Sequence, residues 1–217
     1  MELERIKTNL SLRSHDIFDP ANQMSVSIIG AGSIGSNLCM LLARLGIEDI
    51  TVYDFDIVED HNLGHQAYRV KDIGNKKVLA LKEIIEEATG TIIKTSEMKV
   101  NGFDIKTDIL VLAVDSMEYR KMIYQNASYM NCIDCRMGGE EIQVYSFSCL
   151  DKDQYKKTLF TDEESSPLPC GGKAIGYVSY IATGLMENTI KKMMQGETYP
   201  LEQMFCTKTL TYYSTKI

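Results

Sequence analysis

The sequence lacks any long apolar segment. None of its apolar runs approaches the roughly 18 to 20 residues that a membrane-spanning helix needs. Its N-terminal residues, MELERIKTNLSLRSHDIF, also lack the apolar stretch of a secretory signal peptide. We therefore expect a cytoplasmic protein with no membrane partner.

An excess of basic residues is missing as well. The chain has 23 Lys and Arg against 30 Asp and Glu, which gives a net charge of −7. Nucleic acids and anionic membranes are bound largely through clustered positive charge, so this balance makes both poor partners. A small basic pocket is still compatible with the composition.

The six cysteines do not form the framework of a small secreted scaffold, and we expect reduced thiols. Only Cys132 and Cys135 form a Cys-x-x-Cys pair, whereas most structural zinc sites need two such pairs. In a strand, residues three apart point to opposite faces, so these two thiols are predicted to be small buried hydrophobic groups rather than shared metal ligands.

Internal repeats and low-complexity tracts are also absent. The 217 residues, of which 44% are hydrophobic, suit one globular domain, residues 1–217, with a sizeable core. Residues 1–23 are polar and are expected to form an N-terminal arm. Residues 151–172 lack periodicity and are rich in charge, Ser and Pro, which predicts a mobile crossover loop.

A strand–turn–helix–strand unit stands near the start of the chain. Residues 24–29 are short, apolar and β-branched, as in a strand buried on both faces. A glycine turn follows, then leucines at helical spacing over residues 37–45, and a second strand is predicted over residues 49–54. Such βαβ units have parallel strands and a right-handed connection.

The rest of the chain continues this alternation. Helices are predicted over residues 76–88, 117–127 and 173–195, and strands over residues 91–95, 108–114 and 209–213. A strand pair is predicted within residues 132–149, turned around residues 137–140. The fold class is therefore α/β: a doubly wound, mostly parallel sheet with helices on both faces and an antiparallel C-terminal extension.

Three features fall at the carboxyl ends of predicted parallel strands, where open α/β sheets bind ligands. They are the glycine turn from Gly30 to Gly35, Asp54 after the second strand, and Asp115 after residues 108–114. The turn brings backbone N–H groups and a helix N-terminus to a phosphate. Asp54 stands 19 residues beyond Gly35, a spacing that suits a carboxylate bound to a ribose diol. This pattern alone permits either a nicotinamide cofactor or ATP.

The segment after Asp54 favours a triphosphate. It contains Asp56, Asn62, His65 and Gln66, followed by the Gly-x-x-Lys of residues 74–77. Amide donors and a lysine at the start of a helix suit a triphosphate, which a hydride-transfer cofactor does not require.

Together these motifs resemble the ThiF/MoeB/HesA family, which includes the activating enzymes of ubiquitin and ubiquitin-like proteins. The resemblance covers residues 13–196 and rests on the glycine turn, the Asp-x-Asp-x-Val…Asn-Leu-x-x-Gln string, Gly-x-x-Lys and the aspartate after a hydrophobic strand. It implies a Rossmann-like homodimer that binds ATP and Mg²⁺ and adenylates the C-terminal glycine of a ubiquitin-like or sulfur-carrier protein.

The resemblance also assigns roles to particular residues. Lys77 and Asp115 would be catalytic, with Asp115 binding Mg²⁺, and Arg13 would enter the partner subunit's active site. The residues implied in binding ATP are Gly30, Gly32, Gly35, Asp54, Asp56, Asn62, His65, Gln66 and Lys77. Cys170, in Pro-Cys-Gly-Gly, matches the place where relatives carry a cysteine that links to the carrier, and a thiol near a helix N-terminus can be activated for that attack.

Two departures from the family pattern leave alternatives open. His65 stands where the family commonly has arginine, and a neutral imidazole supplies less charge to a phosphate. The chain also lacks the two Cys-x-x-Cys pairs that many members carry for zinc. Two alternative functions stay open: a NAD-dependent oxidoreductase, which the glycine turn and Asp54 also permit, and a non-catalytic partner subunit, which His65 supports.

Overall fold

The computed structural model describes residues 16–19, 23–160 and 175–215. The elements in chain order, with η marking 3₁₀ helices, are β1 (Val26–Ile29), α2 (Ser33–Leu45), β2 (Ile50–Tyr53), η1 (Asp60–Gly64), η2 (Val70–Asp72), α3 (Lys77–Thr89), β3 (Lys94–Ser96), β4 (Lys106–Leu112), α4 (Met117–Asn126), β5 (Ser128–Gly138), β6 (Glu141–Ser148), α5 (Lys152–Lys156), α6 (Gly176–Met194), β7 (Glu202–Cys206) and β8 (Thr211–Ser214).

One eight-stranded sheet organises the chain, in the order β3-β2-β1-β4-β5-β6-β7-β8. The strands from β3 to β5 are parallel, and β6, β7 and β8 extend the sheet in antiparallel pairs. The order reverses direction between β1 and β4, as in a doubly wound sheet. The predicted fold class, including the antiparallel extension, is therefore confirmed.

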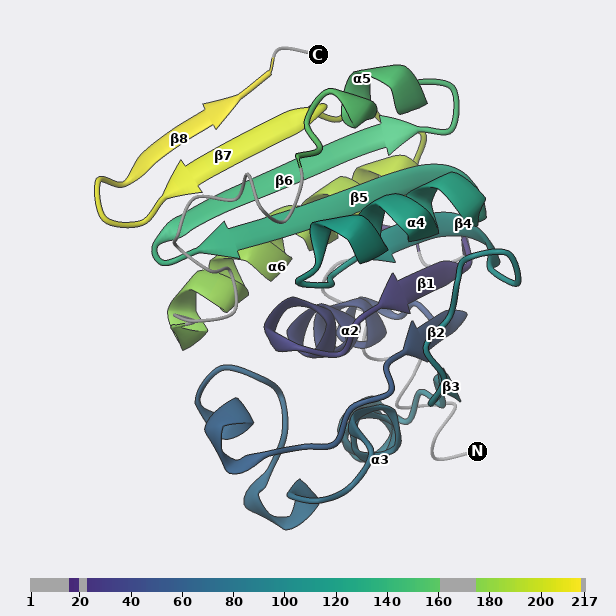
Figure 1. Ribbon diagram of the computed structural model, residues 1–217, viewed down its shortest axis with the longest axis vertical. Coiled ribbons are helices and arrows are strands. Elements are labelled where there is room, and N and C mark those ends of the chain that lie inside the picture. Colours follow the sequence, from purple (N-terminus) through teal and green to yellow (C-terminus); the bar gives the residue numbers. More distant parts are fainter. Residues whose placement is uncertain (1–15, 20–22, 161–174, 216–217) are drawn as a thin grey trace.

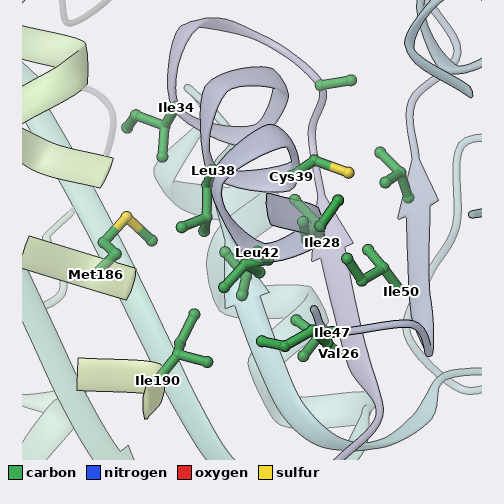
Figure 2. Close-up of a cluster of buried hydrophobic side chains, with 14 of the residues drawn as sticks. Val26, Ile28, Ile34, Leu38, Cys39, Leu42, Ile47, Ile50, Met186 and Ile190 are labelled. Atoms are coloured by element: carbon green, nitrogen blue, oxygen red, sulfur yellow. The ribbon is translucent and has the colours of Figure 1, made fainter. Parts of the chain in front are cut away.

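Helices cover both faces of the sheet (Figure 1). The cluster on one face contains buried side chains of α2, α3 and α6, and the cluster on the other contains those of α4 and α5. In the close-up of Figure 2, Leu38 and Leu42 of α2 lie between Ile28 of β1 and Met186 of α6. The apolar faces of α2 and α6 thus share one core.

Several predicted boundaries differ from the structure. The helix expected over residues 173–195 is Gly176–Met194, and the strand expected over residues 91–95 is Lys94–Ser96. The loop expected over residues 151–172 contains a helix, α5, whose Tyr155 is buried against Phe147 with ring centroids 4.0 Å apart. This contact with β6 orders a segment that has no apolar periodicity of its own. Residues 161–172 of the expected loop lie outside the described part of the chain.

The cysteine prediction is confirmed by the geometry of β5. Cys132 and Cys135 are both buried, and they belong to the two clusters on opposite faces of the sheet. Within the described residues, no helix combines the length and the apolar character that crossing a membrane requires.

Candidate functional site

A cavity of about 970 Å³ lies at the carboxyl ends of the parallel strands. The predicted site residues that line it are Gly30, Gly32, Asp54, Asp56, Asn62, His65, Gln66, Lys77 and Asp115. Gly35 is not among the lining residues. Arg13 and Cys170 lie outside the described residues. The structure thus brings nine of the predicted positions to one space, although the first and the last are far apart in the chain.

The glycine turn is shaped by close packing. Gly30 has φ +97°, and a Cβ there would lie 2.4 Å from the carbonyl oxygen of Ala113. A Cβ on Gly35 would lie 1.9 Å from the carbonyl oxygen of Gly30, so this glycine lets α2 start directly against the turn. A Cβ on Gly32 would meet no protein atom within 4 Å, and this glycine does line the cavity. Gly35 therefore packs the turn, whereas Gly32 leaves room at the cavity wall.

Asp54 ties the end of β2 to the glycine turn. Its Oδ2 accepts a hydrogen bond from the Ala31 N–H at 2.6 Å, and its Oδ1 accepts one from the Asp56 N–H at 2.8 Å. A carboxylate has about four acceptor positions, so two of them are left for the hydroxyls of a ligand.

Lys77 supplies a nearly buried cation. It is the first residue of α3, only 8% exposed, and its Nζ lies 3.2 Å from Asp56 Oδ2. An ammonium group so poorly solvated attracts an anion more strongly than a lysine in open water does.

The 3₁₀ turn η1 holds His65 and Gln66 at the cavity. Asn62 is buried, and its Oδ1 accepts a hydrogen bond from the Glu59 N–H at 2.9 Å, so its side chain shapes the turn. The His65 carbonyl accepts hydrogen bonds from Ser33 Oγ at 3.1 Å and from Asn37 Nδ2 at 3.0 Å, which bind the turn to α2. Burial, together with His61 and Lys77, lowers the pKa of the His65 imidazole from its ordinary value, so the ring is neutral at pH 7.

Asp115 is exposed at the cavity, three residues beyond the end of β4. The N-cap of α4 is the next residue, Ser116, whose Oγ accepts a hydrogen bond from the Tyr119 N–H at 3.2 Å. Helix capping therefore does not occupy the Asp115 carboxylate, which suits a hard divalent cation.

Three cations at the cavity were not predicted from the sequence: Lys99, Arg120 and Arg136. Lys99 Nζ lies 5.6 Å from the ring centroid of Phe55 and 5.3 Å from that of Tyr119. Arg120 lies within α4, and Arg136 lies within β5, two residues before the glycines of the turn to β6. Neither belongs to a motif that indicates a ligand, so only the tertiary structure identifies them. Lys77 and Lys99 bring positive charge to the cavity, which suits a polyphosphate.

Comparison with known proteins gives one family over nearly the whole chain. The sequence profile of the ThiF family matches residues 7–216. A NEDD8-activating enzyme E1 catalytic subunit of Arabidopsis thaliana is 32% identical over 111 residues, which are 48% of this chain and 24% of that protein. A probable molybdopterin-synthase adenylyltransferase of Porphyra purpurea is 33% identical over 118 residues, 51% of this chain and 31% of that protein. The chain thus spans less than a third of the length of these curated relatives.

Solved structures give the same fold. The crystal structure of E. coli MccB with ATP has a TM-score of 0.70 and 18% identity, and the match covers 91% of this chain and 65% of that one. The crystal structure of PaaA has a TM-score of 0.70 and 19% identity, with 99% of this chain and 72% of that chain covered. At this identity the likeness concerns the fold alone.

Proposed function

The chain belongs to the ThiF family, and from that premise we propose that it is an ATP- and Mg²⁺-dependent adenylyltransferase. Its substrate would be the C-terminal carboxylate of a ubiquitin-like or sulfur-carrier protein, which it would activate as an acyl adenylate. Three of the similar proteins described above support this class of reaction. One relative is named as an activating enzyme and another as an adenylyltransferase, and the structure of MccB contains ATP.

The observation that carries the proposal is the shared cavity. The glycine turn, Asp54, Lys77 and Asp115 come from four separate segments and line the same space of about 970 Å³. A volume of that size is at the upper end for small-molecule sites, so it has room for a nucleotide and for the end of a second substrate.

In the proposed reaction, a carboxylate oxygen of the carrier attacks the α-phosphorus of ATP. The new bond is O–P, and the bond that breaks joins the α-phosphorus to the bridging oxygen, which leaves with pyrophosphate. A carboxylate is already nucleophilic, so no general base is needed. The rate then depends on positioning and on charge stabilisation.

The residues of this chain would divide that work. Asp54 would bind the ribose hydroxyls, and the backbone N–H groups at the start of α2 would bind phosphate oxygens. Lys77 would stabilise the charge that develops on the phosphates. Asp115 fits Mg²⁺, because this ion is commonly held by one or two carboxylates together with substrate phosphates. When bound, the ion would neutralise phosphate charge.

Two residues outside the described part of the chain complete the proposal. Arg13 would enter the site of a second copy, so the working unit would be a homodimer. Cys170 would receive the activated acyl group in a later thiol-linked step, with the thiolate attacking the acyl carbon and AMP leaving.

His65 favours one alternative, a non-catalytic subunit that pairs with an active relative. Its imidazole is neutral at pH 7 where the family resemblance implies a positive charge. Lys99 lines the same cavity and is a cation that would compensate for the missing charge.

Pyrophosphate exchange separates these functions. The purified chain is incubated with labelled pyrophosphate, ATP, Mg²⁺ and candidate carriers, and label entering ATP is measured. Carrier-dependent exchange supports adenylation. Tight NADH binding without any effect of ATP would instead indicate an oxidoreductase, and recruitment of a related chain without exchange would indicate a non-catalytic partner.

A variant of the candidate metal ligand makes this test specific. Asp115→Ala should abolish exchange, because the carboxylate for Mg²⁺ is lost. Glu118→Ala is the matched control, since Glu118 is also exposed in the first turn of α4 but does not line the cavity. Equal activity of the two variants would contradict the role assigned to Asp115.

A further inference from the structure

A buried charge cluster lies beside the cavity, outside the sequence motifs. Asp134, on β5, is 0% exposed, and the two arginines that contact it, Arg120 and Arg136, are 3% and 6% exposed. Asp134 forms an ion pair with Arg120 and accepts hydrogen bonds at 2.8 Å from Arg136 Nε and from the Tyr155 hydroxyl. Both arginines line the cavity, whereas Asp134 does not.

A buried ion-pair cluster is weak evidence of a role in stability. Removing charges from water costs several kcal/mol per ion, and apolar side chains of similar volume often stabilise a core as well or better. The cluster is therefore better explained by what the arginines contact than by the ion pairs themselves.

Arg120 contacts the backbone that leads to Asp115. Its guanidinium donates hydrogen bonds to the carbonyl of Leu112, at 3.2 Å, and to the carbonyl of Val114, the residue directly before Asp115. Leu112 is the last residue of β4, and Val114 lies in the segment between β4 and α4. Arg120 thus holds the backbone directly before Asp115 in place.

Asp134 determines where that guanidinium lies. A guanidinium has five N–H donors in a rigid plane, and a carboxylate on one side of it fixes the direction of the rest. On the opposite face of the cluster, Arg136 donates to the Thr158 carbonyl at 2.7 Å, so the carboxylate itself is held from β5 and from the segment after α5. The chain of contacts therefore runs from Asp134 through Arg120 to the support of Asp115.

We infer that Asp134 is a positioning residue that, through Arg120, holds Asp115 in place for Mg²⁺ bound with ATP. The inference rests on the proposed function, because it takes Asp115 as the magnesium ligand. It predicts that the cluster acts on metal-dependent nucleotide binding rather than on nucleotide binding in general.

The test measures ATP affinity by calorimetry, once with Mg²⁺ and once with EDTA. The ratio of the two dissociation constants reports how strongly the metal contributes to binding. In Asp134→Asn and in Arg120→Lys we expect the Mg²⁺ contribution to fall about tenfold, as for other residues that orient a metal ligand. The dissociation constant in EDTA should change less than about twofold, because the glycine turn and Asp54 are untouched.

Tyr155→Phe is the matched control. It removes one hydrogen bond to Asp134 but leaves the ion pair with Arg120, and Tyr155 does not line the cavity. In this variant the ratio of the ATP dissociation constants with Mg²⁺ and with EDTA should equal that of the wild type, even if the melting temperature is lower.

Two outcomes overturn the inference. One is a wild-type ratio in a folded Asp134→Asn variant, since a purely structural role would lower the melting temperature alone. Where Asp134→Asn does not fold, Arg120→Lys decides in the same way, because it retains the charge but cannot span both carbonyls. Failure of the proposed function is seen separately: the wild-type chain would bind ATP with Mg²⁺ normally and yet show no pyrophosphate exchange with any carrier.

Discussion

The two glycines Gly32 and Gly35 should fail in different ways when each is replaced by alanine. In Gly35→Ala the new Cβ would lie 1.9 Å from the Gly30 carbonyl oxygen, against an ordinary contact of at least 3.4 Å. The start of α2 and the turn must then separate by about 1.5 Å, and the atom in the way is backbone, which cannot rotate aside. Overpacking of this kind costs about 3 kcal/mol at the upper end of the usual range.

A gain in helix propensity offsets part of that cost. Alanine is favoured over glycine inside a helix by about 1 kcal/mol. The net loss of about 2 kcal/mol in the free energy of unfolding corresponds to a melting temperature lower by about 4–8 °C for a chain of this size. Thermal unfolding without nucleotide, followed by circular dichroism, measures it.

Gly32→Ala is the matched comparison. Its Cβ meets no protein atom, and Gly32 has φ −79°, which alanine adopts easily. The loss of stability should be at most about 1 kcal/mol, the usual cost of a poorer N-cap. The added methyl group narrows the cavity, however, so the KM for ATP in the exchange assay should rise by about tenfold or more. Equal stability of the two variants, or an unchanged KM in Gly32→Ala, would refute this explanation of the glycine turn.

Three further substitutions test single side chains to which the proposal assigns a role. His65→Arg should lower the KM for ATP about 3- to 10-fold at pH 7.5, because the added guanidinium is charged where the imidazole is neutral. The advantage should shrink as the pH falls through the lowered pKa of His65, because the imidazole then gains a charge of its own, and a constant advantage would show that charge is not the cause. Lys77→Met should lower the exchange rate about 100-fold or more, whereas Lys82→Met, on the same helix but away from the cavity, should leave it unchanged. Cys170→Ala should retain exchange and lose only a thiol-linked intermediate, detected by mass spectrometry; loss of exchange would place this residue in the first step.

The order and type of the main elements could be predicted because they depend on local pattern. Apolar strands such as residues 24–29 and leucines at helical spacing in α2 carry their own signal. Strand β7, Glu202–Cys206, was not predicted. Its sequence, EQMFC, shows no alternation, and it is a strand because it pairs with β6 and β8. That pairing is a property of the tertiary structure.

The residues of the candidate site also divide into those that the local sequence pattern could place and those that depend on the tertiary structure. Gly32, Asp54 and Asp115 could be placed because each follows a predicted strand, and the ends of parallel strands meet at one edge of a sheet. Arg120 and Arg136 could not, since neither the middle of a helix nor a central strand indicates which side chain reaches a ligand. Gly35 was assigned to the cavity by its motif, but it does not line the cavity, and a Cβ there would lie 1.9 Å from the Gly30 carbonyl oxygen, which indicates a packing role.

The burial of three cysteines, two of them on opposite faces of β5, has a consequence for chemical labelling. Three thiols are completely buried, and burial raises their pKa, to about 12 for two of them and well above the usual value for the third: Cys39, Cys135 and Cys132. These groups stay protonated and shielded, so alkylating reagents should leave them unmodified in the folded chain. With Cys149 and Cys206 replaced by serine, the rate of maleimide incorporation would therefore report on Cys170, and the buried sulfurs would react only after denaturation.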